Sequence, residues 1–175
     1  MIDLLKIFGI ILIIFSASCL GFNKSGVFQK RIDELSEFKK GIEKLKTEIT
    51  FVKTPLCDAF LKISEHLEEN ISSVFSGFSV SISTHERCSV TDIWEFNINK
   101  YSKNSCMNKN DIKILRDFGT MLGSTDLDGQ INNFTSVIEL LENQIADAII
   151  EKDKNAGLYR SFGVYAGILI SILLI

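Results

Sequence analysis

Uncharged apolar stretches at both ends of the chain constrain the fold more than any other feature. Residues 7–22 and residues 161–175 contain no Asp, Glu, Lys or Arg. A helix that crosses about 30 Å of hydrocarbon needs about 17 to 25 mostly apolar residues, so each stretch is near the lower limit. Lys6 and Arg160 lengthen the two stretches if their aliphatic stems lie along apolar surface while their charged ends reach water. The predicted division of the chain is a membrane helix at residues 1–22, a soluble domain at residues 23–157 and a second membrane helix at residues 158–175.

The N-terminal stretch also permits a second interpretation, a cleaved secretory signal. Lys6, the apolar stretch and the small residues at 16–18 imitate the three regions of such a signal, and Cys19 stands where a lipoprotein is processed. Asp3 weakens the positively charged region, however, and Ser16 replaces the large residue that usually precedes a lipidated cysteine. We therefore favour an uncleaved anchor, and the alternative is an extracytoplasmic, lipid-anchored helical binding protein lipidated at Cys19.

Positive residues lie on the inner sides of the two apolar stretches. The inner flanks carry Lys24, Lys30, Arg31, Lys39 and Lys40 after the first stretch, and Lys152, Lys154 and Arg160 before the second. The outer flanks carry only Lys6. Because positively charged flanks are retained in the cytoplasm, we expect a cytoplasmic central domain with both termini on the far side of the membrane.

Net charge argues against nucleic acid as a partner. The chain has 19 Lys and Arg against 22 Asp and Glu, a formal net charge of -3. Sequence-independent binding of nucleic acid requires a surplus of positive charge to neutralise phosphates, and no such surplus exists here.

No motif of the sequence brings catalytic or ligand-binding groups together. The phosphate-binding string G-x-x-x-x-G-K-[ST] is absent, and neither His66 nor His85 lies in a metal-binding spacing. Cys19, Cys57, Cys88 and Cys106 are scattered without a C-x-x-C pair, which predicts small, buried or half-buried residues in a reducing compartment. We expect no catalytic residue, cofactor or metal, and we do not expect an enzyme.

One short string has a weak likeness to a calcium-binding loop. Asp126 and Asp128 precede a glycine, but Ser124 and Thr135 occupy the two places where the loop needs carboxylates. We interpret the two aspartates as residues that stabilise the N-terminus of a helix.

Apolar residues between the two stretches recur at three- and four-residue steps, the helical period. The clearest run is Phe28, Leu35, Ile42 and Ile49 at seven-residue intervals, with Phe38, Leu45 and Val52 beside it. This run predicts an amphipathic helix at residues 26–53, ending at Thr54-Pro55, where Thr54 caps the next helix.

The remaining pattern predicts further helices and one loop. A helix follows Pro55, another carries Val74 to Ile82 after a break at residues 70–72, and Ser89 caps a fourth. Residues 102–110 form a loop, Asp111 opens a fifth helix, and residues 123–126 end it. From about Asp126 the pattern continues into the C-terminal apolar stretch. We predict an all-α bundle of about six helices, with the first and last helices antiparallel and the last continuous with the membrane segment.

Two groups of residues are candidates for contacts with other helices or proteins. Gly163, Gly167 and Ser171 repeat at four-residue steps, which allows close packing of membrane helices. Their partner is expected to be either the first segment, at Gly9 and Ser16, or another subunit. Acidic residues on the second helix form a candidate docking surface for a basic partner, together with the loop at residues 102–110. These acidic residues are Asp58, Glu65, Glu68 and Glu69.

Several strings resemble a known family over nearly the whole chain. They are Leu45-x-x-Glu48-Ile49 with Thr54-Pro55-Leu56, then Trp94, then Phe118-Gly119-x-x-Leu122-Gly123-x-x-Asp126 with Gln130, and finally Lys154 with Leu158 to Gly163 and Gly167. Their order and spacing between two apolar ends resemble the stage III sporulation protein AB family of endospore-forming bacteria.

This resemblance implies a cytoplasmic helical bundle similar to a domain of the type II secretion inner-membrane platform protein. It also implies a place in the secretion-like channel that crosses the two membranes around the developing spore, on the mother-cell side of the outer forespore membrane. The implied partners are the ATPase stage III sporulation protein AA and other channel subunits. Self-association through the C-terminal membrane helix is instead an expectation from the spacing of Gly163, Gly167 and Ser171. The function that we expect is therefore a non-enzymatic membrane scaffold that docks a cytoplasmic ATPase.

Overall fold

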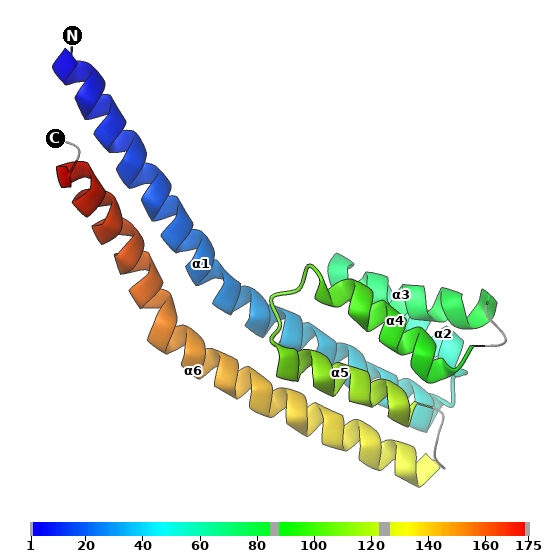
Figure 1. Cartoon of the computed structure of the whole chain (residues 1–175). Helices are drawn as coiled ribbons and strands as arrows, with labels where there is room; N and C mark the ends of the chain where they lie inside the picture. Colours follow the sequence, from blue (N-terminus) through cyan, green and yellow to red (C-terminus); the bar gives the residue numbers. More distant parts are fainter. Residues whose placement is uncertain (1, 85–87, 123–126, 174–175) are drawn as a thin grey trace. The chain divides into compact units, whose positions relative to one another are not determined.

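The computed structural model of the chain describes residues 2–84, 88–122 and 127–173 and is helical, with no strand in these ranges. Six α-helices lie in these ranges and are labelled in Figure 1. They are α1 (Ile2–Thr47), α2 (Leu56–Ser64), α3 (Glu69–Thr84), α4 (Val90–Ser102), α5 (Lys109–Met121) and α6 (Leu127–Leu173), with a π-helical segment, η1 (Glu48–Val52), after α1. The predicted all-α class with about six helices is confirmed.

The first and last helices are longer than the four between them. α1 has 46 residues, so no break separates the N-terminal apolar stretch from the amphipathic helix, which we predicted as separate elements. α6 has 47 residues and continues into the C-terminal apolar stretch, as predicted. Both helices contribute to two compact units. The two-helix unit comprises Met1–Lys30 and Asp147–Ile175, and the bundle unit comprises Arg31–Ala146.

Trp94 lies at the centre of the bundle unit and is fully buried. The centroid of its ring lies 5.4 to 6.0 Å from the centroids of four phenylalanine rings. Three of these rings are nearly perpendicular to the indole, an edge-on arrangement that aromatic pairs favour. The four are Phe60, Phe75, Phe78 and Phe118. The indole Nε1 donates to the carbonyl of Leu115 at 2.5 Å, so the polar atom of this large side chain is also satisfied. Trp94 therefore ties α4 to α2, α3 and α5.

The parts of α1 and α6 inside the bundle unit run antiparallel, as predicted. Lys39 Nζ lies 2.6 Å from a carboxylate oxygen of Glu142, and Lys46 Nζ donates to Thr135 Oγ1 at 2.8 Å. From the first contact to the second, the residue number rises along α1 and falls along α6, so the two helices run in opposite directions. The predicted apolar stripe of α1 is buried in the bundle unit at Leu35, Phe38, Ile42 and Leu45, and α6 contributes the buried side chains Phe134, Val137 and Leu141.

The end of α1 differs from the prediction because the helix widens into η1. A π-turn holds one more residue than an α-turn, so it rotates the residues that follow. Val52, predicted to lie on the buried stripe, is 59% exposed, and Phe51 is 80% exposed. Thr54 does not cap α2, because its hydroxyl donates to Glu48 Oε2 at 2.9 Å and Pro55 occupies the capping position.

The other helix boundaries confirm one prediction and correct two. Ser89 caps α4, accepting from the Thr91 amide at 3.2 Å, as predicted. α3 begins at Glu69, so the break predicted at residues 70–72 is wrong. The chain turns just before α3, where the amides of His66 and Leu67 donate to the carbonyls of Ile63 and Ser64. α5 is capped by Asn108, and Asp111 lies inside its first turn rather than opening it. The predicted helix end at residues 123–126, Asp126 included, lies outside the described residues, as do His85 and the side chain of Asp128.

Candidate interaction site

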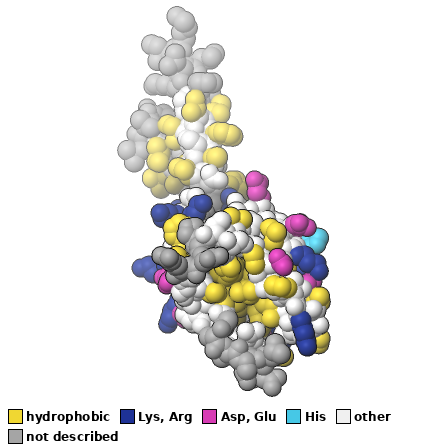
Figure 2. Space-filling model, turned by 90° about the vertical axis from the view of Figure 1, so that its right-hand side faces the viewer, with side chains coloured by type: hydrophobic (Ala, Val, Ile, Leu, Met, Phe, Trp, Pro, Cys, Tyr) yellow, Lys and Arg dark blue, Asp and Glu magenta, His cyan; other side chains and the backbone are white. Residues whose placement is uncertain are grey.

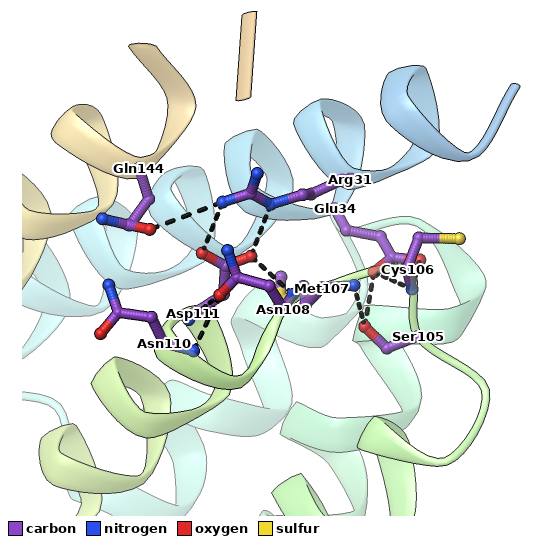
Figure 3. A network of polar contacts seen from close by, with 9 residues as sticks. All are labelled: Arg31, Glu34, Ser105, Cys106, Met107, Asn108, Asn110, Asp111 and Gln144. Atoms are coloured by element: carbon purple, nitrogen blue, oxygen red, sulfur yellow. Dashed lines mark hydrogen bonds and ion pairs between the residues drawn. The ribbon is translucent and has the colours of Figure 1, made fainter. Parts of the chain in front are cut away.

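A buried ion pair joins three helices of the bundle unit (Figure 3). Arg31 of α1 donates through Nε to Asp111 Oδ2 at 2.7 Å and through Nη2 to Oδ1 at 3.1 Å. Arg31 Nη2 also lies 3.5 Å from Gln144 Oε1 of α6. The Asp111 carboxylate is fully buried, and such a bidentate contact satisfies two of its oxygen sites at once. α5 is therefore fixed against α1 by a geometrically specific contact.

The local sequence of α5 places Asp111 in that position. Asn108 Oδ1 accepts from the amides of Asn110 and Asp111 at 2.8 and 2.9 Å. Asp111 Oδ2 in turn accepts from the Asn108 amide at 2.9 Å, which completes a capping box. The carboxylate thus lies at the positive end of the helix dipole, where negative charge is stabilised. One side chain both caps α5 and pairs with Arg31.

The carboxylate of Glu34 in α1 holds the loop before α5, and we predicted this loop as part of a docking surface. Glu34 Oε2 accepts from Ser105 Oγ at 2.7 Å and from the Cys106 amide at 3.1 Å (Figure 3). Beside it, the ring of Tyr101 meets that of Phe38 edge-on at 5.2 Å. Burial raises the pKa of the Tyr101 hydroxyl, and the charge of Glu34 raises it further. The loop therefore has a defined conformation, set from α1.

The acidic residues predicted as a docking surface are exposed on the bundle unit. Glu65, Glu68 and Glu69 gather at the turn between α2 and α3, with His66 exposed beside them. Asp58 is in the first turn of α2, apart from that group. The turn itself is tied to α1, because the Glu68 amide donates to Glu37 Oε1 at 3.1 Å. Docking of a partner at these residues remains a prediction.

Small residues bring the two helices of the two-helix unit into backbone contact. A Cβ added to Gly21 would lie 2.7 Å from the Tyr159 carbonyl oxygen, and one added to Gly163 would lie 2.8 Å from that of Ala17. At Gly167 an added Cβ would lie 3.0 Å from Ile14 Cα. These positions therefore leave no room for a larger side chain.

The residues that face this stripe differ from those predicted. Gly9 has no such neighbour within 4 Å, and Ser16 Oγ donates to the Leu12 carbonyl of its own helix. The facing residues are Ile14, Ala17 and Gly21, because the helices meet closer to the bundle end of α1 than we predicted. The side chain of Ser171 lies outside the described residues. Use of this contact as membrane helix packing remains a prediction.

The outer surface of the two-helix unit is strongly apolar. Large exposed side chains are Ile11, Leu12, Phe15 and Leu20 of α1, with Phe162, Tyr165, Leu169 and Ile172 of α6. Among the described residues, one helix section, Ile11–Val52, is long and apolar enough to cross a membrane, a criterion that signal sequences and core helices also meet. Apolar surface of this extent is typical of a contact with a membrane or another protein.

Within the described residues, no group of three or more His, Cys, Asp and Glu side chains could hold a metal ion. The four cysteines are free thiols. Cys57 and Cys106 are half-buried, as predicted, whereas Cys19 and Cys88 are exposed, so the prediction of burial is wrong for these two.

An apolar hollow at the η1 end of the bundle unit was missed by sequence reasoning. It has a volume of about 210 Å³. Its apolar walls are Ile49, Leu56, Phe118, Met121, Leu122 and Phe134. The available sequence signal was the set of strings that resemble the family, since Thr54, Leu56, Phe118, Leu122 and Gln130 belong to those strings and all line this hollow.

The structure is that of an all-α protein with a helical bundle, whose helices are joined by specific polar contacts, and a two-helix unit with an apolar outer surface. The chain belongs to the stage III sporulation protein AB family, because the sequence model of that family matches residues 6–175. It is 28% identical over 171 residues to stage III sporulation protein AB of Bacillus subtilis (strain 168). The matched region covers 98% of this chain and 99% of that protein. A solved structure of stage III sporulation protein AB (SpoIIIAB) has a TM-score of 0.67 and 26% identity, and the match covers 71% of this chain and 98% of that chain. The resemblance inferred from the sequence strings is confirmed.

Proposed function

We propose that this chain is a non-enzymatic membrane scaffold of a sporulation-specific, secretion-like channel complex, and that its bundle unit docks a cytoplasmic ATPase. The observation that carries the proposal is the continuity of α1 and α6, which run without a break from apolar ends into the bundle unit. A chain built in this way is suited to link a membrane channel to a protein in the cytoplasm. Membership of a sporulation protein family supports the setting.

A scaffold without its own nucleotide site responds to ATP only through a partner whose surface changes on hydrolysis. The exposed acidic residues at the α2–α3 turn offer a charged docking surface for such a partner. Contacts of this kind steer association and weaken as salt screens them, over about 10 Å at 0.1 M.

Packing in the two-helix unit argues against the lipid-anchored alternative. Processing before Cys19 would remove residues 1–18, and with them Ile14 and Ala17, which face Gly167 and Gly163. The stripe of small residues on α6 would then lose most of its contacts with α1. An intact N-terminus in mass spectrometry of the protein from native membranes is therefore expected, and a lipid-modified Cys19 would establish the alternative.

Equilibrium binding of the full chain, held in lipid nanodiscs, to the sporulation ATPase tests the proposal. We expect binding with an affinity that differs between the ATP-bound and nucleotide-free ATPase. Glu65→Lys with Glu69→Lys should slow association, whereas Asp117→Lys with Glu139→Lys, which changes the net charge equally on exposed sites of α5 and α6, should not. Absence of binding in both nucleotide states at about 100 µM, which reveals even weak contacts, would contradict ATPase docking.

A further inference from the structure

A polar cavity lies between α3 and α4, two helices of the bundle unit that pack side by side (Figure 1). It has a volume of about 250 Å³, and we call it the α3–α4 cavity. α3 contributes lining residues between positions 70 and 77, and α4 with the turn after it contributes lining residues between positions 97 and 104. Glu34 of α1 completes the wall. All of these residues belong to the bundle unit.

The most buried polar side chain of this wall is Asn97, which is 8% exposed. Its Nδ2 donates to the Ile93 carbonyl at 2.8 Å, and because a carbonyl only accepts, this bond fixes which atom of the carboxamide is the oxygen. Gly77 leaves room for that oxygen, since a Cβ there would lie 2.7 Å from Asn97 Oδ1. Oδ1 has no hydrogen-bond partner among the described residues. Buried polar atoms are nearly always hydrogen-bonded, so the cavity offers an acceptor that a bound donor would satisfy.

Three exposed polar side chains also line the cavity: Asn70, Lys100 and Asn104. None of the three makes a side-chain hydrogen bond with another described residue. The two carboxamides donate and accept, and the ammonium donates. The charge of Lys100 is balanced by the carboxylate of Glu34, so the charged residues of the wall have no net formal charge.

This set of groups selects a ligand by hydrogen bonds. Figure 2 shows hydrophobic side chains gathered on the face that it presents, and surface of that kind fits any apolar partner. The α3–α4 cavity instead requires both donors and acceptors. A single ammonium is too little positive charge for nucleic acid. The volume is below the roughly 300–1,000 Å³ of pockets that enclose a whole small molecule. The cavity therefore suits an uncharged part of a longer chain.

The main chain of a polypeptide has the matching pattern. Each peptide group carries one N–H donor and one carbonyl acceptor, so successive groups of an extended chain can donate to one carboxamide and accept from the next. Seven positions separate Asn97 from Asn104, at about 1.5 Å each along a helix. That length equals about three residues of extended chain, at about 3.3 Å each.

We propose that the α3–α4 cavity binds an extended segment of a partner protein through its main chain. One peptide N–H of the segment donates to Asn97 Oδ1, and the carbonyls beside it accept from Lys100 and from the carboxamides of Asn70 and Asn104. Asn104 also lies in the loop at residues 102–110, which the sequence predicted as part of a docking surface. This site goes beyond the proposed function, because it does not depend on docking of an ATPase.

Side-chain amide NMR of the full chain in detergent micelles, with isotope-labelled asparagine, tests the proposal. The probe is a pool of tripeptides, N-acetylated and C-amidated, that differ only in the central residue. We expect the Nδ2 signals of Asn97 and Asn104 to shift and to saturate below about 10 mM peptide. The signal of Asn143, which is exposed on α6 and does not line the cavity, should stay in place. Absence of a shift at Asn97 at about 10 mM would overturn the proposal and leave a cavity that holds only water.

Ester analogues of the tightest-binding tripeptide test the direction of the hydrogen bond to Asn97. In these analogues an ester oxygen replaces one N–H group at a time, so one of them has no donor for Oδ1. That analogue should bind about tenfold more weakly, because an acceptor then faces an acceptor. Equal affinity of the tripeptide and all of its ester analogues would contradict the proposal.

Two variants locate the bound tripeptide. Asn104→Ala removes an exposed carboxamide and should weaken binding about threefold to tenfold, whereas Asn143→Ala, the matched control, should leave it unchanged. Asn97→Leu removes the acceptor and should abolish binding, with Trp94 fluorescence reporting whether the bundle unit is folded. If Asn97→Leu does not fold, Asn104→Ala decides, because its side chain is outside the core. Equal binding by Asn104→Ala and the wild type would overturn the proposal.

Discussion

Arg31 Nε lies 2.7 Å from Asp111 Oδ2, and this buried contact joins α1 to the first turn of α5 across 80 positions of sequence. Asp111→Ala would leave the Arg31 charge buried without this partner, so we expect a loss of about 3–5 kcal/mol in the free energy of unfolding. Denaturation of the full chain in detergent micelles, followed by Trp94 fluorescence, measures it. Arg31→Met combined with Asp111→Ala removes both charges and should cost clearly less than the separate costs of Arg31→Met and Asp111→Ala added together. Additive costs would show that the ion pair contributes no coupling.

Gly119 is expected to tolerate no side chain. A Cβ at this position would overlap Cδ1 of the buried Trp94. Gly119→Ala should destabilise the bundle unit by about 1–3 kcal/mol, as overpacking does, and should shift the Trp94 emission. Gly157→Ala is the control, because an added Cβ there has no such neighbour within 4 Å and alanine favours a helix. Equal Trp94 transitions for the two variants would contradict the described packing.

Gly163→Leu should separate the two helices of the two-helix unit, because the Ala17 carbonyl oxygen and Gly21 occupy the space that a side chain needs. We expect a cost on the order of 1–2 kcal/mol, the range of contacts between membrane helices. A change in electrophoretic mobility in detergent measures loss of the contact between α1 and α6 in the two-helix unit. Gly157→Leu should leave mobility unchanged, and a mobility shift from both variants or from neither would argue against the contact.

Tyr101 is expected to make stability depend on pH in the alkaline range. Burial raises the pKa of its hydroxyl, so the folded state favours the neutral form. The resulting stability is complete below the unfolded tyrosine pKa of about 10 and is lost as pH rises above it. Tyr101→Phe should therefore lose less stability than the wild type between about pH 9 and pH 11. Parallel stability curves for the two proteins over this range would show that Tyr101 is not responsible.

Periodicity predicted the helices, the antiparallel pairing of α1 with α6 and the Ser89 cap, because each depends on residues close in sequence or on one repeating stripe. It did not predict η1, because the π-turn depends on Glu48 bonding to Lys62 of the next helix. Nor did it predict the partner of Asp111, since a buried ion pair between distant residues leaves no periodic trace. The residues that face Gly163 depend on where two helices meet, which spacing alone does not fix.

The side of the membrane on which the bundle unit lies tests the central claim most directly. Cys88 is exposed on that unit, so a variant with serine at the other three cysteines gives a single label site. With a membrane-impermeant thiol reagent, we predict no labelling of Cys88 in intact cells and full labelling after permeabilisation. A cysteine appended after Ile175 is the matched control and should react in intact, non-sporulating cells that express the chain in the cell membrane, because both termini are predicted on the far side, which there faces the medium. Labelling of Cys88 in intact cells that hold the folded, inserted protein would contradict a cytoplasmic membrane scaffold.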